Sequence, residues 1–146
     1  YYSVIQSILL TFEKFHISSG RVIATRIPTT SEINVDNSLV SVTWTGLLNG
    51  DDGTPISAAE FADRSIHFFG TFGVGGTIIL EGSNEAVPTN WAPLADPQGT
   101  AISKTQLSVE QLLELTRWVR PRVTAGDGTT SLSAVMLIRR ANSLRT

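Results

Sequence analysis

Residues 66–80 have the sequence IHFFGTFGVGGTIIL, and this stretch decides the fold class. Its first half alternates, so that Ile66 and Phe68 face one side of an extended chain while His67 and Phe69 face the other. A glycine-rich segment then interrupts the alternation, and a second β-branched run follows it. Two such runs separated by a glycine-containing connection predict a β-hairpin.

The same β signals occur on both sides of this stretch. The run LVSVTW at 39–44 is rich in β-branched and aromatic residues, and it ends at the polar turn 49–55. Further strands are predicted over 117–124 and 131–139, joined by a connection that contains the hairpin dipeptide Asp127-Gly128. These elements predict an all-β protein, an antiparallel β-sandwich or jelly-roll-like barrel with at most one or two short helices.

Two segments between the predicted strands have their own patterns. Apolar residues spaced three and four apart predict one or two helical turns over 108–118, at Val109, Leu112, Leu113, Leu115 and Trp118. Ser108 precedes them in the position of an N-cap. In the proline- and asparagine-containing loop before them, we expect Trp91 and Leu94 to close the open end of the core.

The chain divides into two parts by composition. Residues 36–146 contain the clear strand signals and are predicted to form the β-sandwich domain. Residues 1–35 are predicted to be an N-terminal arm or edge strand, and residues 1–17 are rich in apolar side chains. Either this segment adds an edge strand to its own sheet, or it crosses to a neighbouring subunit and pairs there by β-addition. Both alternatives remain open from the sequence.

Composition excludes several classes of function. The chain contains no cysteine, which excludes disulfides, cysteine-ligated zinc, iron–sulfur clusters and thiol catalysis. No run reaches the ~18 consecutive apolar residues of a membrane span, so no membrane partner is expected. The formal net charge of −2 provides no general signal for nucleic acid, and none is expected as a partner.

No catalytic or ligand-binding pattern survives inspection. His16 and His67 lie in no known nucleophile motif. The glycine-rich residues 70–76 precede a predicted strand, whereas a phosphate-binding loop precedes a helix. The acidic turn around Asp51 has part of a calcium-loop spacing but lacks the central glycine. We therefore predict a protein that is not an enzyme and that needs no cofactor or metal.

Charge is unevenly distributed along the chain. Residues 1–116 contain 5 Lys/Arg and 12 Asp/Glu, whereas residues 117–146 contain six arginines and one aspartate. Either the two parts neutralise each other within the fold, or they form complementary faces for assembly. The second alternative yields the candidate partner-interface residues, taken together with aromatic residues of the arm: Tyr1, Tyr2, Phe12, Phe15, Arg120, Arg122, Arg139 and Arg140.

Several short motifs resemble those of a known family. They are VTWTGL at 42–47, GTFG at 70–73, LEGSN at 80–84, Trp91, and VRPRVTAGDGTT at 119–130. In these motifs the chain resembles the capsid cement (decoration) proteins of short-tailed bacteriophages. The resemblance extends over about residues 38–140 and does not include the N-terminal arm.

Membership of that family would imply a specific role. The protein would be a jelly-roll-like β-sandwich on the outer capsid surface of a virion, where it would bind the major capsid protein and bridge neighbouring subunits. Self-association as a dimer or trimer is expected with it. Two alternatives remain. The Gly-Ser-Asn…Asn-Trp…Leu pattern is also similar to that of discoidin-like, carbohydrate-binding β-sandwiches, and another virion component, such as a tail or connector subunit, is the second.

Overall fold

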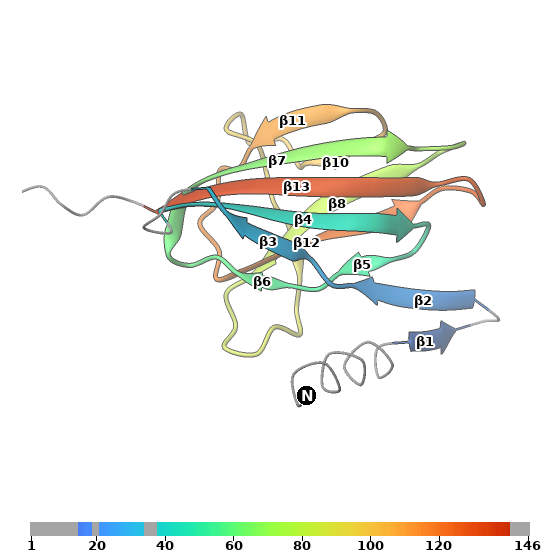
Figure 1. Ribbon diagram of the computed structural model, residues 1–146, viewed down its shortest axis with the longest axis horizontal. Helices are drawn as coiled ribbons and strands as arrows, with labels where there is room; N and C mark the ends of the chain where they lie inside the picture. Colours follow the sequence, from blue (N-terminus) through green and yellow to red (C-terminus); the bar gives the residue numbers. More distant parts are fainter. Residues whose placement is uncertain (1–14, 19–20, 34–37, 141–146) are drawn as a thin grey trace, which may run out of the picture.

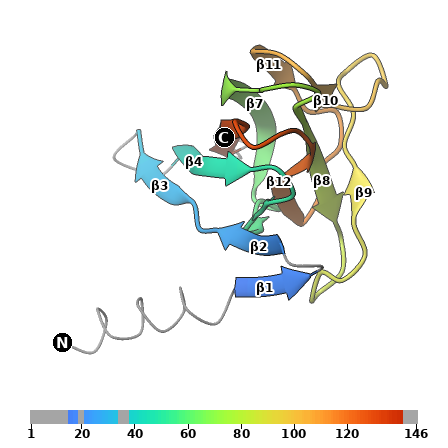
Figure 2. The same cartoon turned by 90° about the vertical axis from the view of Figure 1, so that its right-hand side faces the viewer.

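Strands account for all the regular secondary structure of the described residues (Figure 1). The computed structural model describes residues 15–18, 21–33 and 38–140. Within these ranges two β-sheets pack against each other around one apolar core (Figure 2). The prediction of an all-β sandwich is confirmed, and the sheets do not close into a barrel.

The smaller sheet has five antiparallel strands, with β13 in the middle. β13 pairs with β7 on one side and with β4 on the other along nearly its whole length. The strands, in spatial order, are β11 (Ser108–Gln111), β7 (Phe61–Thr71), β13 (Ser131–Arg140), β4 (Leu39–Leu48) and β3 (Thr29–Glu32).

The larger sheet has eight strands, and the antiparallel pair β12–β8 forms its centre. One pairing in it is parallel, between β2 and β5. The main order is β1 (Phe15–Ser18), β2 (Arg21–Arg26), β5 (Asp52–Gly53), β12 (Trp118–Ala125), β8 (Thr77–Ser83) and β10 (Ser103–Lys104), with β6 (Ile56–Ser57) on β12 and β9 (Ala92–Pro93) on β8.

Both predicted hairpins are wrong, because each pair of consecutive strands is divided between the sheets. β7 belongs to the smaller sheet and β8 to the larger one, and β12 and β13 are divided in the same way. The two glycine-containing connections therefore cross from sheet to sheet instead of turning back within one. They also bond to each other, since the Asp127 carboxylate accepts from the Val74 amide (2.9 Å) and Thr130 Oγ1 donates to the Phe72 carbonyl (2.8 Å).

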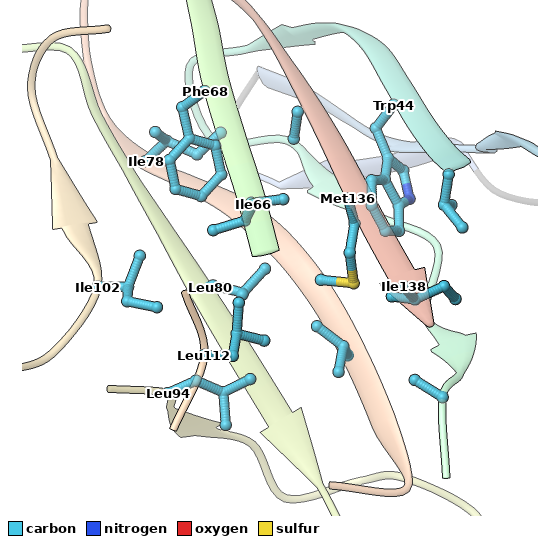
Figure 3. Packing of buried hydrophobic residues seen from close by; sticks show 14 of the residues in the cluster. Trp44, Ile66, Phe68, Ile78, Leu80, Leu94, Ile102, Leu112, Met136 and Ile138 are labelled. Carbon is cyan, nitrogen blue, oxygen red and sulfur yellow. The ribbon is translucent and has the colours of Figure 1, made fainter. Parts of the chain in front are cut away.

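The core follows the period-two alternation of the longest strands. Ile66 and Phe68, which share one side of β7 as their alternation predicts, are buried, and so are Val42 and Trp44 on β4. All four belong to one apolar cluster with Leu80 of the opposite sheet, and Figure 3 shows part of this cluster. Each fully buried side chain of this size contributes about 1.5–3 kcal/mol relative to exposure. The Trp44 indole also donates to the Thr54 carbonyl (3.0 Å), which satisfies its polar atom inside the core.

The predicted helix over 108–118 is wrong. The segment forms strand β11 and then an irregular extended stretch. Its side chains alternate in exposure with period two, so that Leu112 is buried while its neighbour Leu113 is exposed. Apolar residues at mixed spacing imitated a helical face, but they belong to opposite sides of an extended chain.

Candidate interaction surface

The described residues contain no cluster suited to metal binding. No group of three or more His, Asp or Glu side chains among them is arranged to hold a metal ion. The glycine-rich loop uses its Val74 amide to bind Asp127, whose pKa is lowered to about 2 by this bond and by bonds from Thr129. In the described part of the chain, no helix has the length and hydropathy needed to cross a membrane.

Arg120 and Arg122 lie in a charge network on the outer face of the larger sheet. Glu81 accepts from both, at 2.9 Å from Arg120 Nη2 and 3.5 Å from Arg122 Nη1. Asp52 lies 3.3 Å from Arg120 and 3.4 Å from Arg122. Burial raises the pKa of Asp52, and the two arginines oppose that shift. Two cations and two anions face one another, so this network carries no net charge.

Trp91 packs on this network and does not close the core. Its ring lies 4.2 Å from the Arg120 guanidinium carbon, a cation–π arrangement. Leu94, by contrast, is buried in the core as predicted. The loop before Trp91 is held by Glu85, which accepts from the amides of Thr89 (2.7 Å) and Asn90 (2.6 Å). These bonds lower the pKa of Glu85 to about 2.

A hollow of about 450 Å³ lies beside Trp91, and a carbohydrate-binding module would use such a place. Its polar groups already have partners within the chain. Glu85 is bonded to Thr89 and Asn90, and the Glu114 carboxylate accepts from the Ala95 amide (2.8 Å). A sugar would have to compete with these bonds, which disfavours the discoidin-like alternative.

The other predicted arginines lie on the smaller sheet, near the end of β13. Arg139 pairs with Asp63 on β7. Arg140 pairs with Glu60 at 2.8 Å, and its guanidinium carbon lies 5.4 Å from the centre of the Phe61 ring. The four arginines therefore form two groups on different sheets. Every one of them has an acidic partner within the chain, in agreement with internal neutralisation.

The aromatic candidates of the arm are described only in part. Tyr1, Tyr2 and Phe12 lie outside the described residues. Phe15 begins β1, where it pairs with Ala24.

Two adjacent rows on the outer side of the smaller sheet are uncharged across all five strands. One row of laterally paired residues crosses it as Val109, His67, Val135, Thr43 and Thr29. The next row crosses it as Gln111, Ser65, Leu137, Ser41 and Ser31. We call these ten residues the uncharged face. Because the described residues form two sheets only, no third layer of them covers this face (Figure 2).

Two features complete the uncharged face. Phe69 stands beside His67, with ring centres 5.0 Å apart, and adds aromatic surface. A hollow lined by Leu39, Leu137 and Gln111 lies at one end, where the Asp63–Arg139 pair forms a charged rim. Sequence reasoning assigned no role to this face. The signal was present in the outward parity of β7 and β13, which are uncharged at every second position from 65 to 69 and from 133 to 137.

The segment 107–115, which contains the edge strand β11, has reversed polarity. Its apolar side chains face solvent, and their exposed fractions are 66% for Leu107, 63% for Val109, 54% for Leu113 and 58% for Leu115. We call these four residues the outward stripe. The alternate positions 108, 110, 114 and 116 are polar and point toward the protein, which is the opposite of a normal surface strand.

No family model, no curated protein and no solved structure matches this chain. The resemblance to capsid cement proteins therefore stays a prediction. What the geometry offers is a docking surface, made of the uncharged face and the adjoining outward stripe.

Proposed function

We propose that this protein is a non-enzymatic structural subunit of a virion, a cement protein that binds the outer capsid surface and bridges neighbouring capsid subunits. The single observation that supports it is the uncharged face, which extends across five strands and has no covering layer of described residues. An uncharged sheet face has no feature suited to catalysis on a small molecule, whereas it is well suited to contact another protein.

The composition of this face fits the centre of a protein–protein interface. Such centres are depleted of charged residues and enriched in aromatic ones, and their rims are polar. Here His67, Phe69, Val135 and Leu137 occupy the middle, and the Asp63–Arg139 pair lies at the rim.

The face supplies part of a standard interface. Its two rows cross five strands, and with strands about 4.8 Å apart and a rise of about 3.4 Å per residue they cover roughly 24 Å by 14 Å, or roughly 330 Å². A standard interface buries about 800 Å² on each partner, so contacts around the two rows have to supply the rest.

The resemblance to cement proteins provides the identity of the partner, the major capsid protein. A cement protein binds many equivalent positions on a shell, where several modest contacts act together. Avidity then raises overall binding by about 10²–10⁴ over that of a single contact. This favours a broad face of weak contacts over one deep pocket, as the smaller sheet offers.

The test is binding to purified capsids by the full chain and by the double variant Thr43→Lys/Leu137→Lys. Both positions are on the uncharged face, on β4 and β13. Two unpaired lysines at the centre of an interface should weaken binding at least about tenfold, because each must be desolvated without a partner. The matched control is Val87→Lys, an equally polar change at an exposed loop residue away from the face.

Equal binding by the double variant and the wild type would refute a role for the uncharged face. Copy number separates the rival virion roles, since hundreds of copies on the shell support a cement protein and about a dozen at one vertex support a connector. Binding to a glycan array without capsid binding would favour the carbohydrate-binding alternative.

A further inference from the structure

The free edge of the smaller sheet next to the outward stripe is an acceptor for another strand. β11 pairs with β7 on one side only, and it ends the strand order of its sheet. The Leu112 amide donates to the Arg64 carbonyl (3.0 Å), so alternate residues of this segment direct their backbone toward β7. Val109 and Gln111 therefore direct their amide and carbonyl groups toward the free edge. Exposed edges of this kind recruit additional strands.

The side chains of the outward stripe stay exposed to solvent because specific contacts hold the opposite, polar side of segment 107–115 against the protein. Glu110 pairs with Lys104 of β10, and Glu114 accepts from the Ala95 amide (2.8 Å). Thr116 accepts from the buried Arg64 at its carbonyl (2.8 Å). A slip by one residue would bury the leucines but would break all three contacts. Four exposed apolar side chains are thus held at a free strand edge.

The chain itself contains a segment with the matching chemistry. Residues 1–14 carry two charged side chains, Glu13 and Lys14, at the end next to β1. The remaining positions include eight aromatic or aliphatic residues: Tyr1, Tyr2, Val4, Ile5, Ile8, Leu9, Leu10 and Phe12. A segment of this composition in extended form offers apolar side chains on both faces, which suits a strand that covers the outward stripe.

Geometry favours the segment of another copy over the segment of the same one. β1 and β11 lie at opposite sides of the molecule in both views (Figures 1 and 2). Fourteen extended residues span at most about 50 Å. A domain of this length has a radius of gyration of about 15 Å, which corresponds to a sphere of radius about 19 Å, and half the circumference of that sphere is about 60 Å. The extended length of residues 1–14 is therefore shorter than the path around the domain from β1 to β11 of the same chain.

We propose that residues 1–14 of one copy pair with β11 of a second copy and cover its outward stripe. Donor and acceptor are different edges, so the contact is head-to-tail and builds either a closed ring or an open filament of copies. Main-chain hydrogen bonds at Val109 and Gln111 provide affinity, and the stripe provides specificity. This inference rests on the proposed function in one respect, that the protein works as an assembled structural subunit.

Disulfide cross-linking tests the pairing in the full chain, which has no cysteine of its own. One copy carries Gln111→Cys, and the other carries Val4→Cys, Ile8→Cys or Phe12→Cys in separate experiments. Three positions are used because the register of the pairing is not known in advance. When the two copies are mixed and oxidised, at least one of the three combinations should give a covalent dimer. The matched control replaces Gln111→Cys by Thr30→Cys, on the other edge strand of the same sheet, and should give none.

Failure of all three pairs, or equal cross-linking to Thr30→Cys, would overturn the proposal. A monomeric disulfide in a chain that carries both substitutions would overturn it as well, because the segment would then occupy its own edge.

A second variant pair addresses the backbone. Gln111→Pro removes the amide that faces the free edge, whereas Gln111→Ala removes the same side chain and keeps the amide. Light scattering should show at least tenfold weaker self-association for the proline variant only. Equal self-association of the two variants would contradict edge pairing.

Capsid binding is measured on the same samples. If cross-linking succeeds and the Thr43→Lys/Leu137→Lys variant still binds capsids like the wild type, the proposed function fails while the self-association stands. If cross-linking fails and that variant loses capsid binding, the proposed function stands alone.

Discussion

Replacing Arg64 with methionine tests whether one buried guanidinium stabilises the two segments that connect the sheets, at Ala58 and at Thr116. Arg64 lies on β7 and is only 3% exposed. It donates to the carbonyl oxygens of Phe61 (2.7 Å), Thr116 (2.8 Å) and Ala58. No carboxylate among the described residues pairs with it, and burial lowers its pKa. Neutral oxygens alone, these three carbonyls and the Thr116 hydroxyl (3.4 Å), therefore compensate this buried charge.

Methionine keeps most of the apolar length of the side chain and donates no hydrogen bond. The carbonyls of Phe61 and Thr116 each lose a charged donor, at about 1–3 kcal/mol each, or about 2–6 kcal/mol together. Removal of the buried charge offsets part of this loss of stability, because moving a guanidinium out of water on folding is unfavourable. We expect a net loss of about 3 kcal/mol in the free energy of unfolding. For a domain of this size that lowers Tm by about 6–12 °C.

Urea and thermal unfolding of the isolated protein measure this effect. The matched control is Arg139→Met, because Arg139 is paired with Asp63 at an exposed position. An exposed pair contributes at most about 1 kcal/mol. Arg64→Lys should also be destabilised, since one ammonium group cannot reach three separate carbonyls. If Arg64→Met loses no more stability than Arg139→Met, the reasoning is refuted, and the hydrogen bonds of Arg64 merely balance its burial.

Two further predictions concern single residues of the framework. Gly53→Ala should destabilise the fold by about 1–3 kcal/mol, because the new Cβ would lie 2.6 Å from the Pro121 ring; Gly128→Ala meets no atom within 4 Å and should stay within about 0.5 kcal/mol of the wild type in the same urea experiment. The pKa values of Glu85 and Asp127, both lowered to about 2, mean that the folded protein holds these carboxylates ionised more strongly than the unfolded chain does. Their contribution to stability is present above about pH 5 and is lost as the pH falls toward about 2, so Tm differences between wild type and Glu85→Gln should shrink over that range; a constant difference would contradict this account.

Strand parity was accessible from the sequence, whereas strand pairing was not. Ile66 and Phe68 are buried as their alternation predicts, because one face of a strand must meet the core. The connections at 72–76 and 126–130 have hairpin composition, yet each crosses between the sheets. Glycine provides the backbone freedom that a crossing and a hairpin both need, so local composition cannot separate them. What separates them is the pairing of β13 with β4 and β7, which are distant in sequence.

The candidate surface was hidden for a related reason. The spacing of apolar residues that include Leu113 and Leu115 predicts helical turns over 108–118, whereas both side chains are exposed on an extended segment. In the fold Glu114 and Thr116 take the inner positions, because the Glu114 carboxylate accepts a hydrogen bond from the Ala95 amide and the Thr116 carbonyl accepts one from the Arg64 guanidinium. Those partners lie on other segments of the chain, and no local pattern reveals them. A reversed surface of this kind becomes visible only when the three-dimensional contacts are known.

The central place of β13 has a consequence during protein synthesis. β13 follows the other four strands of its sheet along the chain, and it begins roughly 80 residues after β4 ends. At about 5–20 residues per second, a ribosome needs roughly 4–16 s to cover that distance. From the completion of β7 onward, β4 and β7 have both been synthesised while the strand that must lie between them has not. A nascent chain that stalls before residue 131 therefore exposes the apolar side chains and the unpaired edges of β4 and β7, which are the features that make incomplete chains prone to aggregate.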